Sequence, residues 1–445
     1  MERDCMHSDS VSRRDFLKTT AGTSLALAAP AWAAPRGAND RIVIGAIGLG
    51  RQGTYDMRDL ARHGATVAAV CDVYAPNLQQ GLTAAGGKAD TYTDFRRILD
   101  RKDIDAVVIG APDHWHAAMT VMACQAGKDV YVEKPSSVHI AEGRRMVEAA
   151  RHYDRVVQVG TQQRSGVHFQ RAVELIWAGH IGKVNFVRTW NYDNEYPVGI
   201  GNPPDSAPPS DLDWDMWLGP APQRPFNANR FGVAPDRWST FRYFWDYAGG
   251  MMTDWGVHLL DIVQWALKAD GPSVISSVGG KYLLEDDRET PDTLVASFEY
   301  PGCVVTYENR TCNANSMYNH GYGIEFHGTD GTLFVDRSGF EVFPENRQVN
   351  KQSVALTETA EMKDLPDSHA NHVINFLECM RTRQKPISDI EIGHRSTSCC
   401  LLANISYRTG RRLTWDTKTE RLLEGGAAAE ALLAFHYRAP WSLKV

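Results

Sequence analysis

Short apolar runs alternate with segments of helical character from residue 41 onward. Runs rich in β-branched residues occupy 41–47, 66–71, 105–110, 130–132 and 156–159. Each is followed by a helical segment or a glycine-containing turn, as where 78–85 ends at Gly86 and Gly87. Short, fully apolar strands joined by helices indicate an α/β fold with a doubly wound parallel sheet.

The pattern changes after residue 160. Residues 197–225 contain eight prolines and little periodicity, which indicates a long irregular insertion. Alternation of apolar and polar residues in the segments 293–298 and 304–307 predicts antiparallel strands. We therefore expect a Rossmann-type domain over 39–160 and an α+β domain over 161–445 with an open, mostly antiparallel sheet.

Length and charge narrow the class of protein. A chain of 445 residues is long for one domain, and its net charge of −7 argues against nucleic acid as a partner. No apolar run outside the N-terminal segment is long enough to cross a membrane. The eight cysteines include no CxxC pair, so most are expected to be buried thiols, with a disulfide left open.

The N-terminal segment has the features of an export signal. The stretch Ser12-Arg13-Arg14-Asp15-Phe16-Leu17-Lys18 resembles the twin-arginine signal, and Ala31-Trp32-Ala33 offers a cleavage site after an apolar stretch. We expect residues 1–34 to be a twin-arginine signal peptide and the protein to be periplasmic. That route carries folded proteins, which suits a protein that loads a cofactor before export.

A glycine-rich turn between the first strand and its helix predicts a dinucleotide site. Gly48, Gly50 and Gly53 form a G-x-G-x-x-G pattern in the context that gives it meaning. Asp72 ends the second strand, where a carboxylate binds the adenosine ribose and repels a 2′-phosphate. NAD is therefore expected over NADP, although Arg51 in the glycine loop could favour NADP.

Three further segments suggest acid–base chemistry. Glu133-Lys134-Pro135 and the segment 111–116 both follow strands, at the sheet edge where ligands bind. In 249–261, Asp254 and His258 are four residues apart and so share a helix face. Removing hydride from an alcohol needs a base, which a histidine supplies, and a lysine can polarise the oxygen. Taken alone, the Asp–His pair could also be a buried structural pair.

Together these motifs resemble the Gfo/Idh/MocA family, which includes glucose–fructose oxidoreductase and inositol dehydrogenase. The resemblance implies hydride transfer between NAD(P) and a secondary hydroxyl of a sugar or polyol, and a homo-oligomer. It implies Lys134, Asp254 and His258 as catalytic residues, with His258 as base and Asp254 orienting it or the substrate. The expected cofactor contacts are Gly48, Gly50, Arg51, Gln52, Gly53, Asp72, Ala111, Pro112, His116, Glu133 and Lys134.

Substrate contacts are less well marked. Flat aromatic faces cover sugars well, so Trp190 and Trp245 are candidates, together with Trp214 and Trp217, although core packing of each remains open. Arg164 and Tyr247 are further candidates. His369 and His372 lie three apart without an evident third ligand, so we expect surface or interface histidines and no metal site.

Export also bears on the reaction, because little free NAD is available outside the cytoplasm. A tightly bound NAD that returns to its starting state would suit either transfer of hydride to a second carbonyl or a redox-neutral glycoside hydrolysis. The second reaction oxidises a ring hydroxyl, eliminates the substituent, adds water and reduces the ketone. A sugar-binding protein without turnover is a third class, against which the intact Lys134, Asp254 and His258 argue.

Overall fold

The computed structural model describes residues 41–445 apart from 234–238, 316–318, 364, 366–367 and 435. The predicted signal peptide, residues 1–34, lies outside these residues. Ile42–Val445 form one compact unit, so the two predicted domains are packed together.

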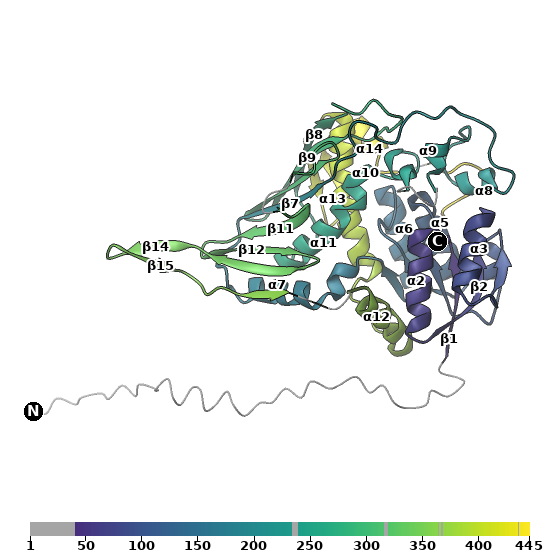
Figure 1. Ribbon diagram of the computed structural model, residues 1–445, viewed down its shortest axis with the longest axis horizontal. Coiled ribbons are helices and arrows are strands. Elements are labelled where there is room, and N and C mark those ends of the chain that lie inside the picture. Colours follow the sequence, from purple (N-terminus) through teal and green to yellow (C-terminus); the bar gives the residue numbers. More distant parts are fainter. Residues whose placement is uncertain (1–40, 234–238, 316–318, 364, 366–367, 435) are drawn as a thin grey trace, which may run out of the picture. The chain divides into compact units, whose positions relative to one another are not determined.

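A six-stranded parallel sheet carries the glycine-rich turn (Figure 1). Its order is β3-β2-β1-β4-β5-β6, so the direction of winding reverses between β1 and β4. In such sheets ligands bind at the carboxyl ends of the strands beside this reversal. The strands are β1 (Ile42–Ile47), β2 (Ala65–Cys71), β3 (Asp90–Tyr92), β4 (Ala106–Ile109), β5 (Asp129–Val132) and β6 (Val157–Val159). The predicted doubly wound sheet is confirmed.

Helices cover both faces of this sheet. One face packs on α2 (Arg51–Arg62), α3 (Ala75–Ala84) and α12 (Ser368–Thr382), and the other on α4 (Arg96–Leu99), α5 (Asp113–Gln125) and α6 (Ile140–His152). Although α12 comes from late in the chain, its Val373 and Phe376 share a core with Met57 of α2. Helix α5 begins at Asp113, four residues earlier than the predicted 117, and an acidic residue is favoured in the first turn of a helix.

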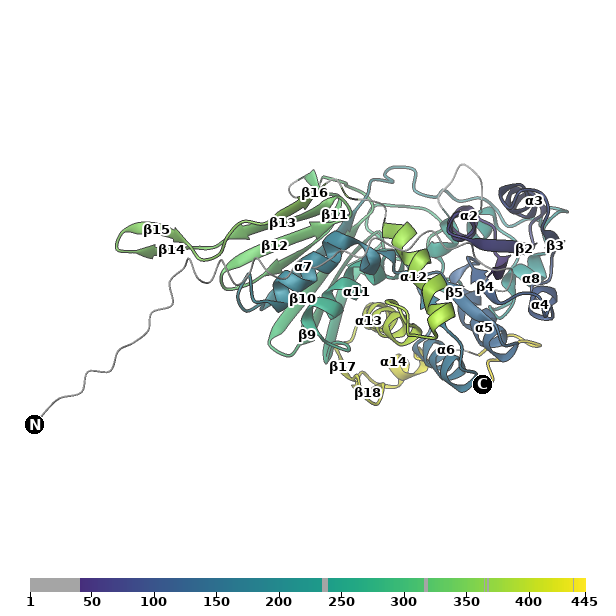
Figure 2. The same cartoon turned by 90° about the horizontal axis from the view of Figure 1, so that it is seen from below.

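The second sheet has ten strands and is antiparallel except where β7 pairs with β10. Its order is β16-β13-β12-β11-β7-β10-β9-β8-β17-β18, which confirms the predicted open sheet. The strands are β7 (Phe186–Tyr192), β8 (Val274–Gly280), β9 (Thr293–Tyr300), β10 (Cys303–Arg310), β11 (Tyr322–His327), β12 (Gly331–Asp336), β13 (Gly339–Pro344), β16 (Glu361–Lys363), β17 (Leu413–Asp416) and β18 (Arg421–Glu424). A separate hairpin, β14 (Asn346–Val349) and β15 (Gln352–Ala355), extends from one end of the sheet (Figure 2).

Three helices cover one face of the second sheet. They are α7 (Val167–Trp177), α11 (Gly256–Leu267) and α13 (Ile390–Thr409), which share the largest apolar core with the strands (Figure 2). Short elements complete the fold: the 3-10 turns η3 (Gln162–Ser165) and η4 (Thr240–Tyr243), and the helices α8 (Trp214–Leu218), α9 (Ala228–Phe231), α10 (Gly250–Asp254) and α14 (Ala427–Ala431).

The structure also shows the state of the cysteines and the character of the helices. Seven cysteines lie in the described part of the chain, and all seven are buried free thiols; Cys5 lies outside it. Among the described residues, no helix combines the length and apolarity that a membrane crossing demands.

Candidate active site

The glycine turn leaves room for a ligand at one position and none at the others. Gly48 has φ +80°, and a Cβ there would lie 2.4 Å from Ala111 N. A Cβ on Gly53 would lie 2.0 Å from Gly48 O, whereas a Cβ on Gly50 would meet open space. The turn is therefore closed on its protein side and open at Gly50, beside the first free N–H groups of α2. A pyrophosphate fits this cradle.

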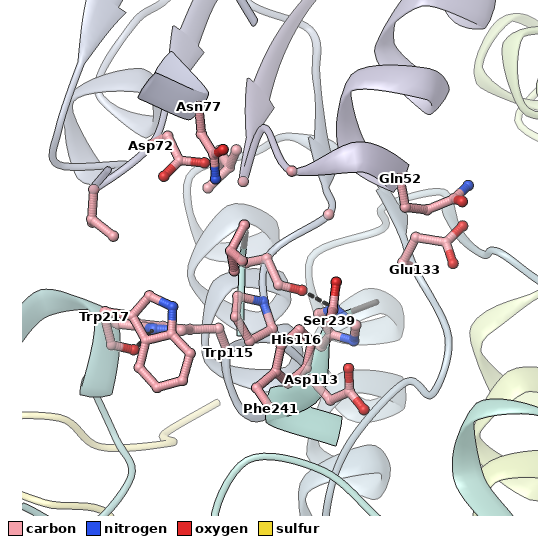
Figure 3. Close-up of a pocket in the computed structure, with 18 of the residues that line it drawn as sticks. Gln52, Asp72, Asn77, Asp113, Trp115, His116, Glu133, Trp217, Ser239 and Phe241 are labelled. Carbon is pink, nitrogen blue, oxygen red and sulfur yellow. Dashed lines mark hydrogen bonds between the residues drawn. The ribbon is translucent and has the colours of Figure 1, made fainter. Parts of the chain in front are cut away.

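A cleft of about 920 Å³ runs from this turn along the edge of the sheet. Asp72 and Asn77 lie at one end of it, and Gln52 and Glu133 lie at the other (Figure 3). The predicted cofactor residues that line it are Gly48, Gly50, Arg51, Gln52, Asp72, Ala111, Pro112, His116, Glu133 and Lys134. Gly53 packs beneath the turn instead.

Asp72 is a fixed anion in the wall of the cleft. Its carboxylate accepts hydrogen bonds from Leu49 N (2.7 Å) and Tyr74 N (2.9 Å). Burial raises the pKa of Asp72 to about 6, and these N–H groups oppose that rise. At neutral pH the carboxylate is therefore mostly ionised and held in one orientation.

The far wall of the cleft comes from the proline-rich insertion and the residues after it. The lining residues from this part of the chain include Met216, Trp217, Phe231, Val233 and Phe241. Figure 3 shows Trp217 and Phe241 opposite the sheet. Trp217, considered above as a sugar contact, thus belongs to the dinucleotide cleft. A dinucleotide in this cleft would be enclosed between the sheet and the insertion.

His116 joins the two loops that follow β4 and β5. Its Nδ1 lies 2.6 Å from Pro135 O, and its Nε2 lies 2.8 Å from Ala111 O. Burial lowers the pKa of His116 to about 4. A neutral ring donates to only one of these two carbonyl oxygens, and through that hydrogen bond His116 helps to hold the loops after β4 and β5.

A second cavity adjoins the cleft. The two share Gln52, Glu133, Lys134 and Arg242 as lining residues. The remaining wall of the second cavity is formed by Tyr55, Gln162, Gln163, Asp254, Trp255, His258, Arg337, Ser368 and His369. Lys134 and His258 therefore face one cavity, and Lys134 also faces the cleft.

Asp254 is shared by two cations. Its Oδ1 accepts from Lys134 Nζ (2.6 Å) and from Arg242 Nε (2.9 Å). Although burial opposes it, the charges of Lys134 and Arg242 hold the pKa of Asp254 well below its usual range. Asp254 was expected to orient His258 or the substrate; the structure shows it orienting Lys134.

His258 lies on the same wall without a carboxylate partner. Asp254 ends α10 and His258 lies in the first turn of α11, with Trp255 between the two helices. His258 Nδ1 is buried, and no described residue forms a hydrogen bond with it. Burial, followed by the charges of Lys134 and Arg337, lowers the pKa of His258 well below its usual value. The imidazole is therefore neutral, and it lines the cavity.

Glu133 contributes little negative charge to the site. Its Oε1 accepts from Gln162 Nε2 (2.7 Å). Burial, followed by the charge of Asp56, raises the pKa of Glu133 to about 8. At neutral pH the carboxyl group is mostly protonated.

His369 and His372 are buried, so their expected surface or interface position is wrong. His369 lies between Asp56 (2.8 Å) and Asp59 (2.7 Å) of α2, and His372 bonds Ser165 Oγ (2.8 Å). The helix α12 that carries them covers the first sheet, which the local sequence does not reveal. Within the described residues, no cluster of histidine, cysteine and acidic side chains suits a metal ion.

The four predicted substrate contacts lie away from the described cavity walls. Arg164 bonds buried Asp261 (2.6 Å), and Trp190 stacks on Tyr192 and Phe334 on the outer face of the second sheet.

Tyr247 and Trp245 complete this set. Tyr247 is buried edge-on against Trp217, with their ring centroids 4.9 Å apart. Trp245 Nε1 bonds Glu289 O (3.2 Å) beneath the guanidinium of Arg408. Core packing, the alternative left open above for the tryptophans, accounts for these positions.

Two cavity residues have no sequence signal. Arg242 belongs to the 3-10 turn η4, and Arg337 to the turn between β12 and β13. Neither stands at a motif spacing from Lys134 or His258. Only the folded chain places them in the cavity.

Two family models match most of the chain. The model described as "Oxidoreductase family, NAD-binding Rossmann fold" matches residues 42–161. The model described as "Oxidoreductase family, C-terminal alpha/beta domain" matches residues 175–443. The chain belongs to the Gfo/Idh/MocA oxidoreductase family. The NAD-binding Rossmann model covers the glycine-rich turn and all six strands of the first sheet.

Relatives within the family include inositol dehydrogenases. Inositol 2-dehydrogenase of Salmonella paratyphi B is 33% identical over 152 residues, which are 34% of this chain and 45% of that protein. The match thus spans about half of that relative. The scyllo-inositol 2-dehydrogenase (NAD(+)) of Bacillus subtilis is 23% identical over 84% of this chain and 96% of its own.

Solved structures share the Gfo/Idh/MocA fold. Levoglucosan dehydrogenase, in complex with NADH and levoglucosan, superimposes with a TM-score of 0.64 at 18% identity, covering 84% of this chain and 99% of that one. Aldose–aldose oxidoreductase from Caulobacter crescentus gives 0.62 at 20% identity over the same shares.

Proposed function

We propose that the chain is an NAD-dependent oxidoreductase that transfers hydride between the nicotinamide and a secondary hydroxyl of a sugar or polyol. The observation that carries this proposal is the position of Lys134, which lines both the dinucleotide cleft and the adjoining cavity. Asp254 and His258 lie in the same cavity. The inositol dehydrogenases among the relatives support this class of substrate.

Each side chain has a distinct role in this proposal. Lys134, fixed by Asp254, donates a hydrogen bond to the substrate oxygen and stabilises the charge that develops there. The neutral His258 accepts the hydroxyl proton. A bound nicotinamide supplies the acceptor for the hydride of the same carbon. Asp254 and His258 are buried and the side chain of Lys134 is only 11% exposed, which limits competition from water for these hydrogen bonds.

The preference for NAD over NADP rests on Asp72. Its ionised carboxylate points into the cleft wall with a fixed orientation, and it would repel a 2′-phosphate on the ribose. Arg51 also lines the cleft, at the start of α2, so the preference is one of degree.

The substitution that tests the function is Lys134→Ala. We expect purified protein to carry bound dinucleotide whose reduced-nicotinamide absorbance rises when a reactive sugar or polyol is added. Lys134→Ala should lower this rate on the order of 10²- to 10⁴-fold, the usual range for removing a positioned proton-transfer or charge-stabilising group. The bound dinucleotide should remain after gel filtration.

The matched control is Lys363→Ala, a lysine exposed on β16 that should leave the rate unchanged. If no sugar or polyol in a broad panel reduces the bound dinucleotide, the proposal fails. Release of the aglycone from an aryl glycoside without net reduction would indicate redox-neutral hydrolysis instead.

We further propose that the chain is exported with its dinucleotide already bound. The enclosing insertion supports retention of the ligand, and the twin arginines support the route. Replacing Arg13 and Arg14 by lysine should leave the protein in the cytoplasm as an uncleaved precursor. Periplasmic fractionation checks this, and unaltered export of the double variant would contradict it.

A further inference from the structure

Arg337 is a cation in the wall of the second cavity, and the described residues include no ion-pair partner for it. It lies in the turn between β12 and β13, at the cavity wall, and is exposed. Among the residues the structure describes, no carboxylate forms an ion pair with it. A cavity wall with an uncompensated guanidinium is suited to a ligand that carries an anion.

The neighbouring carboxylate is already engaged. Asp336 Oδ2 lies 2.7 Å from His320 Nδ1, and its Oδ1 accepts from Ser338 N (2.7 Å) and Ser338 Oγ (2.5 Å). These contacts engage both carboxylate oxygens of Asp336, and no ion pair joins Asp336 to Arg337. In this turn the side chain of Arg337 is therefore exposed, whereas that of Asp336 is hydrogen-bonded within the protein.

Aromatic rings position the guanidinium. Arg337 Cζ lies 4.9 Å from the ring centroid of Trp255 and 5.9 Å from that of Tyr322. The rings of Trp255 and Tyr322 are themselves 4.6 Å apart. Stacking of this kind fixes the plane of the guanidinium and leaves its edge for ligands.

Gln163 links Arg337 to the catalytic histidine. With its amide oriented to donate to His258 O (2.8 Å), Gln163 accepts from Arg337 Nε (3.3 Å). This contact occupies Nε and leaves both Nη groups to bind a ligand. Arg337 is also close enough that its charge lowers the pKa of His258.

The charges of the whole cavity point the same way. Lys134 and Arg242 both contact the ionised carboxylate of Asp254, and Glu133 is mostly protonated. The positive charge of His369 is balanced by Asp56 and Asp59. Among the described residues, Arg337 is thus a cavity-lining cation without an ion-pair partner, and the hydrogen-bonding groups near Lys134 suit a hydroxyl.

We propose that the substrate is a sugar acid, an aldonate or uronate, whose carboxylate binds the Nη groups of Arg337 while its reacting hydroxyl lies at Lys134 and His258. This inference rests on the proposed oxidoreductase function. A carboxylate matches the planar fork of one guanidinium, whereas a phosphate dianion normally recruits more than one cation or a helix N-terminus.

The test uses full-length protein with its bound dinucleotide and matched pairs of ligands. The pairs are glucose and glucuronate, galactose and galacturonate, mannose and mannuronate, and sorbitol and gluconate, with glucose 6-phosphate as a further arm. Binding is measured by calorimetry and reduction by nicotinamide absorbance. We expect at least one acid to exceed its neutral partner about 10- to 100-fold in both binding and kcat/KM.

Arg337→Gln should lower kcat/KM for that acid on the order of 10- to 100-fold and for the neutral partner by at most a few-fold. The kcat/KM of Arg337→Lys for the acid should lie between those of the unmodified protein and Arg337→Gln, because lysine keeps the charge but lacks the planar fork of the guanidinium. The control Arg310→Gln removes a guanidinium stacked 3.6 Å from the ring centroid of Tyr192, outside the described cavity walls, and should change neither substrate. Added salt should weaken the binding of the acid but not that of the neutral partner, because the charge of the exposed Arg337 is screened by salt.

The outcomes separate the two proposals. The sugar-acid proposal is overturned if neutral sugars reduce the dinucleotide as well as every acid does, or if Arg337→Gln lowers kcat/KM equally for acid and neutral substrates. The oxidoreductase proposal would then still stand. Arg337-dependent binding of an acid without reduction supports the anion site and removes the oxidoreductase. If glucose 6-phosphate binds more tightly than every sugar acid, the proposal of a carboxylate-bearing substrate is overturned.

Discussion

Asp254 shows how one residue controls the charge of the site. Without its carboxylate, the ammonium of Lys134 and the guanidinium of Arg242 would face each other at short range in a buried place. Repulsion between like charges of this kind is large where water is excluded. Asp254 therefore fixes Lys134 and also reduces the repulsion between Lys134 and Arg242.

The residue-scale prediction is that Asp254→Asn lowers kcat about 10²- to 10⁴-fold, because Lys134 loses the partner that orients it. Single-turnover reduction of the bound dinucleotide measures this. Asp246→Asn is the control, since Asp246 pairs with Arg224 (2.9 Å) outside the described cavity walls. A rate within a few-fold of the unmodified protein would remove Lys134 positioning from the mechanism.

At the scale of elements, a buried ion triad fastens α12 to α2. His369 of α12 contacts Asp56 and Asp59 of α2, on the face of the first sheet that α12 covers. Although burial opposes it, the two carboxylates raise the pKa of His369 to about 9. Burial also raises the pKa of Asp56, so the triad's net gain is smaller than the shift of His369 alone implies.

We predict that His369→Leu lowers the free energy of unfolding by roughly 3–5 kcal/mol at pH 6, because two buried carboxylates lose their cation. The pKa of His369 is higher in the folded state than in the unfolded state, where it is about 6.5. The stabilisation is therefore complete below about pH 6.5 and is lost as pH rises through about 9.

Urea unfolding of the two proteins at pH 6 and pH 10 checks this. The difference between them should shrink at pH 10, whereas His180→Leu, whose ring faces Glu358 O (3.0 Å), should show little effect at either pH. An equal difference at both pH values would exclude a charged His369.

At the scale of the whole molecule, the C-terminal segment closes back on the first sheet. Trp441 stacks on Phe95 and meets Trp115 edge-on at 4.7 Å. Both of these partners line the dinucleotide cleft. Arg438 bonds Asp215 and Gly219 O, so the same segment holds the insertion that forms the far wall.

We expect Trp441→Ala to speed the release of bound dinucleotide on the order of 10-fold, because loss of the ring loosens the packing behind the cleft wall. Dissociation can be followed by nicotinamide fluorescence after dilution. The control Leu423→Ala removes an exposed apolar side chain on β18 and should leave the rate unchanged. If the two variants release dinucleotide equally, the segment has no part in retention.

Local sequence determined the parts of this protein that depend on neighbouring residues. The glycine turn, the strands β1, β2 and β4, and the location of Lys134 after β5 follow from short-range periodicity and from the backbone freedom of glycine. The four-residue spacing of Asp254 and His258 correctly indicated that both lie at one cavity, although Asp254 ends α10, His258 belongs to α11, and the two side chains do not pair.

Only the tertiary structure decided which distant side chains meet. Arg242 and Arg337 enter the cavity from turns with no motif, and His369 becomes buried because α12 packs on a sheet formed some 200 residues earlier or more. Most of the tryptophans singled out for a sugar pack elsewhere, because an aromatic side chain is equally suited to a core. Sequence patterns reflect local geometry. The charge of a cavity depends on side chains from distant elements, and no local pattern shows which of these elements will meet.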